Sequence, residues 1–600
     1  MAIGNSSETA VFLSAPHDTL AAHLQANPSA VRTVVIVPPL VEERKACHRA
    51  LVEVGRLLAA QGAAVLRFDP RGCGDSSGSF TDFTVADWSA NVVLAARALR
   101  RMHPQAPQIW LGVRAGALLA LQQASAAAST ERPDALVLWE PVTGPEFTRQ
   151  LLQRRLVNEM VAYGQARLGR HAIEERLAAG ETVDFDGFPI TGRLYHDLQD
   201  LQPCPWDGPG LIVSTGPETR TADACHSLAP AATRLRLRLP PFWNTVGSVD
   251  THTVTEATAE WIETSCISHT STFCGSPFDI LRFPKGASQF PRGSATPWRD
   301  SLDNPPSLQP APPDDSERMV SFPGAHAGAV RGVLHRPTIA TTPRGRIVFL
   351  HGWSGDRVGP HRMFVHAARM LAGLGYTSLR LDFSGRGDSD GADEETMIAT
   401  MTADARAALA WLRAEVPAGG PMALLAICSG CKVAISAAVA EPDVVRLALW
   451  SAESMGSLRH TATGSRKRLA VLRAYARKLL RPETWRKLLR GQVRAGMVGK
   501  ALVQAEVRSP AEARAEDETL LAFRQFRGDI LFVFGGSDPD TPGSSQAYTR
   551  YCREHGIRHT CHIVPHAGHS YYGAEWEQEV LQVTKKWLDL ACRQQPTQTA

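Results

Sequence analysis

The sequence predicts an α/β protein made of two tandem copies of one domain, each with a parallel-rich sheet and flanking helices. Residues 32–100 align almost without gaps with residues 345–413 at a constant offset of 313. Within each copy, short apolar runs alternate with amphipathic helical stretches, the pattern of a parallel sheet covered by helices on both faces. A chain of 600 residues is also longer than one hydrophobic core usually serves.

The predicted strands and the loops between them occupy matching places in the two copies. The first two strands of each copy are expected at 34–37 and 63–68, and at 347–350 and 377–381. A Gly/Asp/Ser loop follows the second strand, "GCGDS" in the first copy and "GRGDS" in the second. It lacks the third glycine of a dinucleotide-binding fingerprint, so no NAD is expected.

Domain limits are expected where the composition changes. We take residues 1–265 as the first copy and 319–600 as the second copy, and use these names throughout. Residues 266–318 are rich in Pro, Ser and Asp with little periodicity, which predicts a linker. An insertion at about 455–525 lies where related folds carry a helical lid.

Composition excludes several classes of protein. With 44% hydrophobic residues, 21% charged residues and a net charge of +4, the chain reads as an ordinary globular protein with no sign of nucleic-acid binding. The eleven cysteines show no disulfide rhythm, and the CxxC at Cys428 and Cys431 lacks a second pair of zinc ligands. No metal or cofactor is therefore expected. Without a signal peptide or a long apolar run, we expect a cytoplasmic protein with no membrane span and with reduced thiols.

The stretch "MALLAICSGCKVAIS" at 422–436 predicts a strand, a tight turn and a helix. A nucleophile elbow has this layout, with small residues two places before and after the nucleophile, because the helix backs closely onto the strand. Centred on Cys428, the flanking residues are Ala426 and Gly430, both small. Centred on Ser429, one flank would be the bulky Ile427. The spacing therefore puts Cys428 at the apex.

The repeat supports the same register. In the first copy, "GVRAG" frames Arg114 with two glycines, and the alignment places Arg114 on Cys428. A single cysteine is more often a buried, unreactive core residue than a catalytic nucleophile. The residues that follow favour a catalytic role instead.

Candidate partners of Cys428 follow in the order nucleophile, acid, histidine. Asp538 comes after the apolar run "DILFVFGG", and His569 comes after a further predicted strand. His569 would deprotonate the thiol and Asp538 would orient its ring. The backbone amides of Trp353, in the loop after the first strand, and of Ser429 would form the oxyanion hole.

With these motifs, the second copy resembles α/β hydrolases of the serine-aminopeptidase and esterase-like group. It differs in having Cys as the nucleophile, as dienelactone hydrolases and polyhydroxyalkanoate synthases do. The first copy resembles the hydrolase-like proteins encoded with exosortase A systems, through "VPPLVEERKACHRA" and "DPRGCGDSSG". That second resemblance implies a bacterial surface-polysaccharide or protein-sorting locus and no defined substrate.

The first copy lacks the parts for this chemistry. Arginine replaces the nucleophile at Arg114 and cannot be deprotonated to attack an acyl group. No Gly-His pair stands where His569 would align, and "VPPL" places prolines in the oxyanion loop. We expect a non-catalytic domain. The alternative is that Arg114, at a helix N-terminus, binds a carboxylate or phosphate.

The lid region is strongly basic, with thirteen Lys or Arg and a single acid in residues 459–500. This is either a solvated helix face or a surface that steers an anionic carrier such as coenzyme A. The sequence therefore predicts a hydrolase acting on an ester or thioester through Cys428, His569 and Asp538. An acyltransferase with the same triad and a non-catalytic scaffold are the alternatives. The partner would be a small-molecule or carrier-bound acyl substrate; the sequence predicts no oligomeric state.

Overall fold

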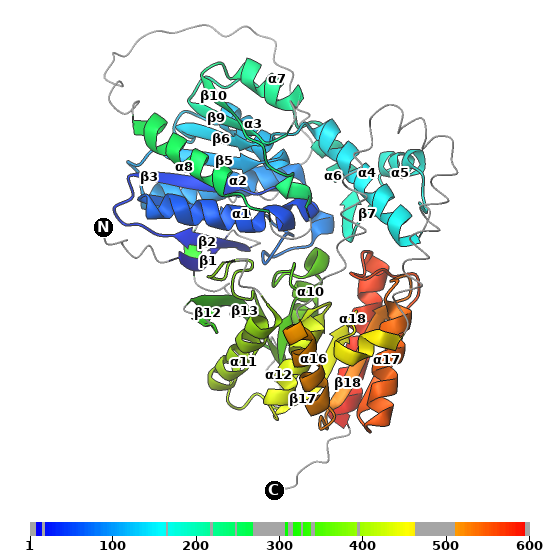
Figure 1. The fold of residues 1–600 in the computed structure, drawn as a ribbon. Coiled ribbons are helices and arrows are strands. Elements are labelled where there is room, and N and C mark those ends of the chain that lie inside the picture. Colours follow the sequence, from blue (N-terminus) through cyan, green and yellow to red (C-terminus); the bar gives the residue numbers. More distant parts are fainter. Residues whose placement is uncertain are drawn as a thin grey trace, which may run out of the picture. The chain divides into compact units, whose positions relative to one another are not determined.

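The fold is drawn in Figure 1 from a computed structural model. The structure describes residues 8–14, 19–163, 166–216, 220–245, 249–267, 307–309, 316–325, 328–337, 343–392, 397–461 and 510–593. Most of the predicted linker and of the predicted lid lies outside these residues. Among the described helices, none is long and apolar enough to cross a bilayer.

The chain forms two compact units whose limits differ from those of the repeat. Unit 1 consists of Met1–Ala340, Ser354–Gly373 and Arg380–Glu395. Unit 2 consists of Thr341–Trp353, Leu374–Leu379 and Thr396–Ala600. Unit 1 therefore combines the first copy with segments of the second. The domain limits expected from the sequence stay a prediction.

The first copy contains a nine-stranded sheet in the order β10-β9-β6-β5-β3-β4-β2-β1-β11. Its strands are β1 (Glu8–Ser14), β2 (Thr19–Gln25), β3 (Arg32–Val37), β4 (Ala63–Phe68), β5 (Gln108–Val113), β6 (Ala135–Trp139), β9 (Gly210–Ser214), β10 (Ala232–Arg236) and β11 (Ser307–Gln309). Strands β3, β4, β5, β6, β9 and β10 pair in parallel, and β1, β2 and β11 add an antiparallel edge. This edge was not expected from the sequence, and β11 lies inside the predicted linker.

Helices cover both faces of this sheet, as the alternation of strands and helices predicts. In β3, Val34 and Ile36 pack with residues of helices α1 (Val41–Ala60) and α8 (His252–Ile267). Figure 1 labels α1 and α8 beside this sheet. Val35 and Val37 point the other way, into the core formed with α2 (Val85–Met102) and α3 (Ala115–Ala126).

After β6 come α4 (Gly144–Tyr163), α5 (Arg170–Ala178), the hairpin of β7 (Thr182–Phe185) and β8 (Phe188–Thr191), and α6 (Gly192–Gln199). Helix α7 (Arg220–Leu228) follows β9.

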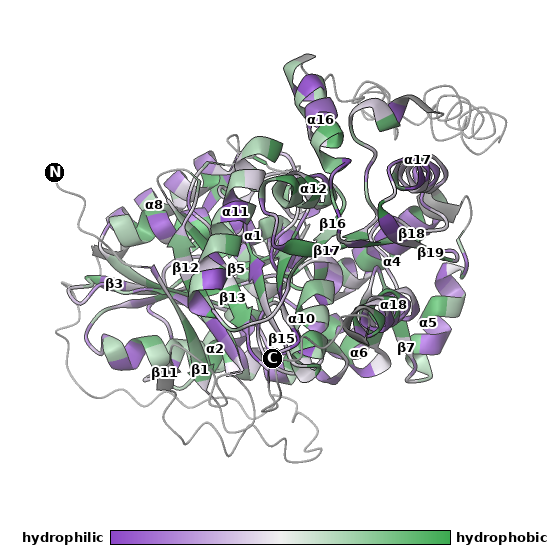
Figure 2. Cartoon of the chain, turned by 90° about the horizontal axis from the view of Figure 1, so that it is seen from below, coloured by the Kyte–Doolittle hydropathy of each residue, from purple (hydrophilic) through white to green (hydrophobic). Residues whose placement is uncertain are grey.

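The second copy has an eight-stranded sheet in the order β12-β13-β15-β14-β16-β17-β18-β19. Its strands are β12 (Glu317–Pro323), β13 (Ala329–His335), β14 (Gly345–Leu350), β15 (Tyr376–Leu381), β16 (Met422–Ile427), β17 (Val444–Trp450), β18 (Asp529–Gly535) and β19 (Arg558–Val564). Its helices include α10 (Met363–Gly373), α11 (Ile398–Glu415), α12 (Gly430–Ala440), α16 (Pro510–Phe523), α17 (Thr541–Glu554) and α18 (Ala574–Arg593). Figure 2 colours β16 and β17 as hydrophobic, which suits strands buried on both faces.

Parallel pairing brings the carboxyl ends of β14, β16, β17, β18 and β19 to one edge of this sheet. In the register, Leu350 pairs with Ala426, and Ile427 pairs with Trp450. Gly535, at the end of β18, pairs with Val564, at the end of β19. The loops that follow these strands therefore open at the same edge, where open α/β sheets carry their functional residues.

The repeated Gly/Asp/Ser loop is structural, since it encloses an aspartate. The carboxylate of Asp382 accepts the N–H of Asp388 at 3.0 Å, and the Ser389 hydroxyl donates to the carbonyl oxygen of Asp382 at 2.7 Å. Gly387 has φ +48°, and a Cβ there would lie 2.2 Å from the Asp382 carboxyl carbon. Only glycine fits so close an approach. The same contacts recur around Asp69 in the first copy.

Within unit 1, buried ion pairs repeat at the offset of the sequence repeat. Arg67 Nη1 lies 2.8 Å from Asp388 Oδ1, and its counterpart Arg380 Nη2 lies 2.8 Å from Asp75 Oδ1. Arg357 bonds to both Asp75 and Asp388. Each pair thus joins residues of the two repeats reciprocally, as in an interface between identical partners.

Candidate active site

Cys428 lies at a sharp turn between β16 and α12. Its φ of +60° is in the left-handed region, and its N–H donates to the carbonyl oxygen of Trp450 at 3.0 Å. Gly430 lets the helix back onto β14, because a Cβ there would lie 2.4 Å from the carbonyl oxygen of Leu350. This strained strand–turn–helix arrangement is the geometry of a nucleophile elbow.

The first copy keeps the same backbone at the aligned position. Arg114 has φ +58°, and its N–H donates to the carbonyl oxygen of Trp139 at 2.9 Å. Gly112 would place a Cβ 2.6 Å from the Cα of Ala117. The structure therefore gives Arg114 and Cys428 equivalent places in their turns, as the alignment of the repeats predicts.

His569 and Asp538 meet in the loops after β19 and β18. The ring Nδ1 of His569 lies 2.8 Å from Asp538 Oδ2. Burial lowers the pKa of His569, but hydrogen bonds to Asp538 and Cys428 and the charges of both outweigh it, so the pKa is raised to about 11. The side chain of Asp538 is only 6% exposed, whereas that of His569 is 35% exposed and open to a substrate.

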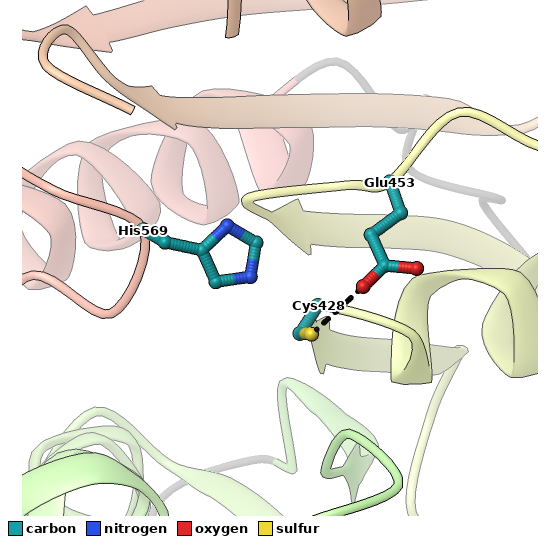
Figure 3. Close-up of side chains that lie close together, drawn as sticks. All are labelled: Cys428, Glu453 and His569. Atoms are coloured by element: carbon teal, nitrogen blue, oxygen red, sulfur yellow. Dashed lines mark hydrogen bonds between the residues drawn. The ribbon is translucent and has the colours of Figure 1, made fainter. Parts of the chain in front are cut away.

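Glu453, which follows β17, is a hydrogen-bond partner of the Cys428 thiol. The thiol of Cys428 donates to Glu453 Oε1 at 3.2 Å (Figure 3). The ring of His569 faces the same point, and the ligand atoms of the three side chains lie within 4.8 Å of one another. Glu453 was not among the site residues expected from the sequence. Its position directly after a predicted strand, "LALWSAE", was the signal that could have found it.

Lys432, on the first turn of α12, holds the other oxygen of that carboxylate. Its Nζ lies 2.9 Å from Glu453 Oε2, and the lysine side chain is 1% exposed. Burial raises the pKa of Glu453, but the charge and hydrogen bond of Lys432, together with Cys428 and His569, lower it to about 2. Glu453 is therefore ionised beside the thiol at neutral pH.

The two expected oxyanion donors lie next to each other. The N–H of Trp353 donates to the hydroxyl of Ser429 at 2.9 Å, so that amide already has an acceptor. Gly352 lies tightly against the elbow, because a Cβ there would be 3.2 Å from the Cβ of Cys428. Trp353 itself is 43% exposed.

Cys431, three residues after Cys428, has a different environment. It is fully buried, and its thiol donates to the carbonyl oxygen of Trp450 at 3.4 Å. Burial raises the pKa of Cys431 well above that of a free thiol. Of these two thiols, Cys428 is the accessible one.

The family comparisons assign both halves of the chain. Residues 347–583 match the model of the alpha/beta hydrolase family, and residues 28–171 match that of serine aminopeptidase, S33. Both copies are α/β-hydrolase domains. The tandem fold expected from the sequence is thus confirmed, and so is the serine-aminopeptidase resemblance, although the serine-aminopeptidase model matches the first domain. The link to exosortase A systems stays a prediction.

The similar solved structures include an esterase and a dienelactone hydrolase. Est1E from Butyrivibrio proteoclasticus, solved with ferulic acid, is 14% identical, with 45% of this chain and 98% of that chain covered and a TM-score of 0.32. A dienelactone hydrolase from Anabaena variabilis is 16% identical, with 46% of this chain and 97% of that chain covered and a TM-score of 0.30. The Pyrococcus furiosus esterase Pf2001 is 16% identical, with 46% of this chain and 91% of that chain covered and a TM-score of 0.33. The search of curated proteins found no match.

In the first α/β-hydrolase domain, the guanidinium of Arg114 is already partnered. It bonds to both carboxylate oxygens of Glu43 at 3.2 Å and to Gln150, and it lies 4.5 Å from the ring centroid of Trp243. The arginine is 3% exposed. Anion binding at Arg114 stays a prediction, and an anion would have to displace Glu43.

Proposed function

We propose that the second α/β-hydrolase domain hydrolyses an ester or thioester through Cys428, His569 and Asp538. The observation that carries this proposal is the elbow at Cys428, with its positive φ, facing an imidazole that is bonded to Asp538 at 2.8 Å. The family match supports the reaction class but not the substrate.

The chemistry follows the general scheme of covalent acyl transfer. The thiol proton moves to His569, whose raised pKa holds it there, and the sulfur of Cys428 attacks the acyl carbon as a thiolate. The carbonyl oxygen becomes an oxyanion held by the N–H groups of Trp353 and Ser429. When it collapses, the leaving group departs with the proton from His569. Water then attacks the thioester, with His569 as the base, and releases the acid and the free thiol.

The ionised Glu453 imposes a restriction on the acyl group. Its Oε1 lies 3.2 Å from the sulfur, so a carboxylate or phosphate attached close to the scissile carbonyl would be repelled. We infer that the acyl portion is neutral next to the carbonyl. An anionic carrier would have to be bound farther out.

Acyl transfer is the second candidate, because a cysteine nucleophile forms a thioester that thiols and amines can intercept. In this case the acyl-enzyme partitions to an added acceptor in preference to water. The first domain is proposed to be non-catalytic, since Arg114 occupies its elbow and pairs with Glu43.

The test uses the full chain with a chromogenic short-chain ester. We expect turnover that iodoacetamide abolishes and that Cys428→Ala lacks, whereas Cys561→Ser, a change at an exposed thiol on β19, keeps it. An added amine or thiol acceptor should change the product only if transfer is the true reaction. A chain that neither turns over esters nor reacts at Cys428 would be a scaffold.

A further inference from the structure

Three side chains of different chemistry converge at the elbow: a thiol, a carboxylate and an imidazole. The sulfur of Cys428, a carboxylate oxygen of Glu453 and a ring nitrogen of His569 lie within 4.8 Å of one another. Figure 3 shows all three directed toward one point from separate loops. Since Nδ1 of His569 bonds to Asp538, the nitrogen that faces this point is Nε2.

We propose that Cys428, Glu453 and His569 bind one Zn²⁺ ion, which occupies the nucleophile and holds the site inactive until the metal is removed. The binding itself does not require that the domain be an enzyme. The inhibition rests on the proposed function.

The donor set is one that zinc prefers. Zinc in proteins is held by thiolate, imidazole and carboxylate, at about 2.3 Å for sulfur and 2.0–2.2 Å for nitrogen and oxygen. Tetrahedral geometry with these bond lengths separates neighbouring ligand atoms by about 3.5 Å. The distance from Cys428 Sγ to Glu453 Oε1 is 3.2 Å, and the His569 nitrogen lies within 4.8 Å of both atoms. Closing the site around an ion therefore needs shifts of at most about 1.3 Å.

The surroundings resemble those of a metal site as well. Metal-bound histidines usually donate their other N–H to a carboxylate, and Asp538 is placed for this at 2.8 Å from Nδ1 of His569. Ligating carboxylates are themselves hydrogen-bonded, and Lys432 bonds the far oxygen of Glu453 at 2.9 Å. These contacts orient two of the three ligands before any ion arrives.

An ion could reach the site, and a fourth position would remain. The side chains of Glu453 and His569 are 31% and 35% exposed. Three protein ligands leave one place for water. On binding, the thiol and the imidazole give up their protons to solvent as the Zn–S and Zn–N bonds form. A sulfur in such a bond is no longer free to attack an acyl carbon.

A second trio among the described residues serves as a contrast. Glu8, His23 and Asp388 also place their ligand atoms within 4.8 Å. There, Arg67 pairs with Glu8 and with Asp388, and Arg357 adds a further positive charge. These guanidinium groups neutralise the carboxylates that an ion would need. At the elbow, the cation that pairs with Glu453 among the described residues is Lys432, and its ammonium lies on the far carboxylate oxygen.

The binding test uses the full chain after dialysis against a chelator, with Co²⁺ as the optical probe and Zn²⁺ as the competitor. We expect one equivalent of Co²⁺ to give a sulfur-to-cobalt charge-transfer band that Zn²⁺ abolishes. Cys428→Ser should lose the band, and Glu453→Gln should weaken binding at least about tenfold. Asp538→Asn should weaken it about 10- to 100-fold through the His569 ring. Cys561→Ser is the matched control for loss of one thiol and should change nothing.

The second measurement follows turnover while Zn²⁺ is added and then chelated. We expect ester turnover to be lost when one equivalent of Zn²⁺ has been added and to recover fully when the chelator removes it. Absence of the charge-transfer band, or a band unaffected by Cys428→Ser, overturns the site. Activity that is unchanged or raised by bound Zn²⁺ overturns the inhibition. A chain that binds Co²⁺ through these residues but turns over no ester leaves the metal site standing and removes the proposed function.

Discussion

The backbone amide of Trp353 donates a hydrogen bond to the hydroxyl of Ser429 across 2.9 Å. This contact links the two residues whose amides are expected to hold the oxyanion. A substrate oxygen must therefore displace the Ser429 hydroxyl from the Trp353 amide before the hole is formed. In the proposed mechanism, the hydroxyl is thus a competitor of the oxyanion for the Trp353 amide.

Ser429→Ala should therefore retain activity. Both proposed oxyanion donors are backbone groups and survive the change, whereas loss of a donor costs about 10²- to 10³-fold in kcat. We expect kcat/KM for a chromogenic ester within about tenfold of wild type. Ser454→Ala, which removes a nearby hydroxyl bonded to Ser544, is the control. A hundredfold loss in Ser429→Ala alone would mean that the hydroxyl takes part in the reaction.

Asp538→Asn should lower kcat by about 10²- to 10⁴-fold, because the base His569 loses the carboxylate that orients its ring. The hydrogen bond and charge of Asp538 help to raise the pKa of His569 to about 11. The His569 ring should therefore titrate at lower pH in the variant, which NMR of the imidazole protons measures. Asp529→Asn, at the opposite end of β18, should alter neither quantity. An unchanged His569 titration would contradict the assigned role.

Much of this arrangement could be predicted from the sequence. The spacing of small residues around Cys428 and the alignment with Arg114 led to the turn that the structure has, because a close helix–strand approach demands small flanks. The order of Asp538 and His569 along the chain placed them at the same sheet edge, because parallel strands end together.

The parts that could not be predicted depend on contacts between distant segments. Glu453 is one carboxylate among many in the sequence. Its role became visible when the structure placed it beside Cys428 and Lys432. Similarly, β11 is only three residues long, and its partner β1 lies near the other end of the first copy in the sequence. So short a segment has no hydrophobic pattern from which a strand could be predicted.

Glu8→Gln should destabilise unit 1 in a pH-dependent way. Burial raises the pKa of Glu8, but Arg67, Arg56, His23 and Arg331 outweigh it and lower the pKa from 4.5 to about 2. A depressed folded-state pKa contributes stability above the unfolded value of 4.5, and that stability is lost as pH falls toward 2. The contribution is at most about 3 kcal/mol near neutral pH.

Urea titrations of wild type and variant over this pH range measure the effect. The stability difference should be largest near neutral pH and should shrink as the solution is acidified. Glu53→Gln, at the surface pair with Arg49, is the control and should show a small difference at every pH. A Glu8→Gln difference that grows on acidification would contradict the ion-pair account.

Transfer from an acyl carrier is a prediction that depends on the basic insertion. Residues 459–500 carry thirteen Lys or Arg and a single acid, and most of this segment lies outside the described residues. If it attracts a phosphate-bearing carrier, kcat/KM for an acyl-coenzyme A should exceed that for a matched simple ester. Salt should reduce the advantage, because it screens exposed charges. A simple ester that is the better substrate at every ionic strength would contradict this role.

The central claim is that the sulfur of Cys428 carries the acyl group, and trapping the acyl-enzyme tests it most directly. The full chain is mixed with a chromogenic acetyl ester, denatured rapidly and analysed by fragmentation mass spectrometry. The account predicts one acetyl group on Cys428, removed by hydroxylamine as a thioester should be and absent from Cys428→Ala. An acetyl group on Ser429 or Cys431, or full turnover in Cys428→Ala, would contradict it.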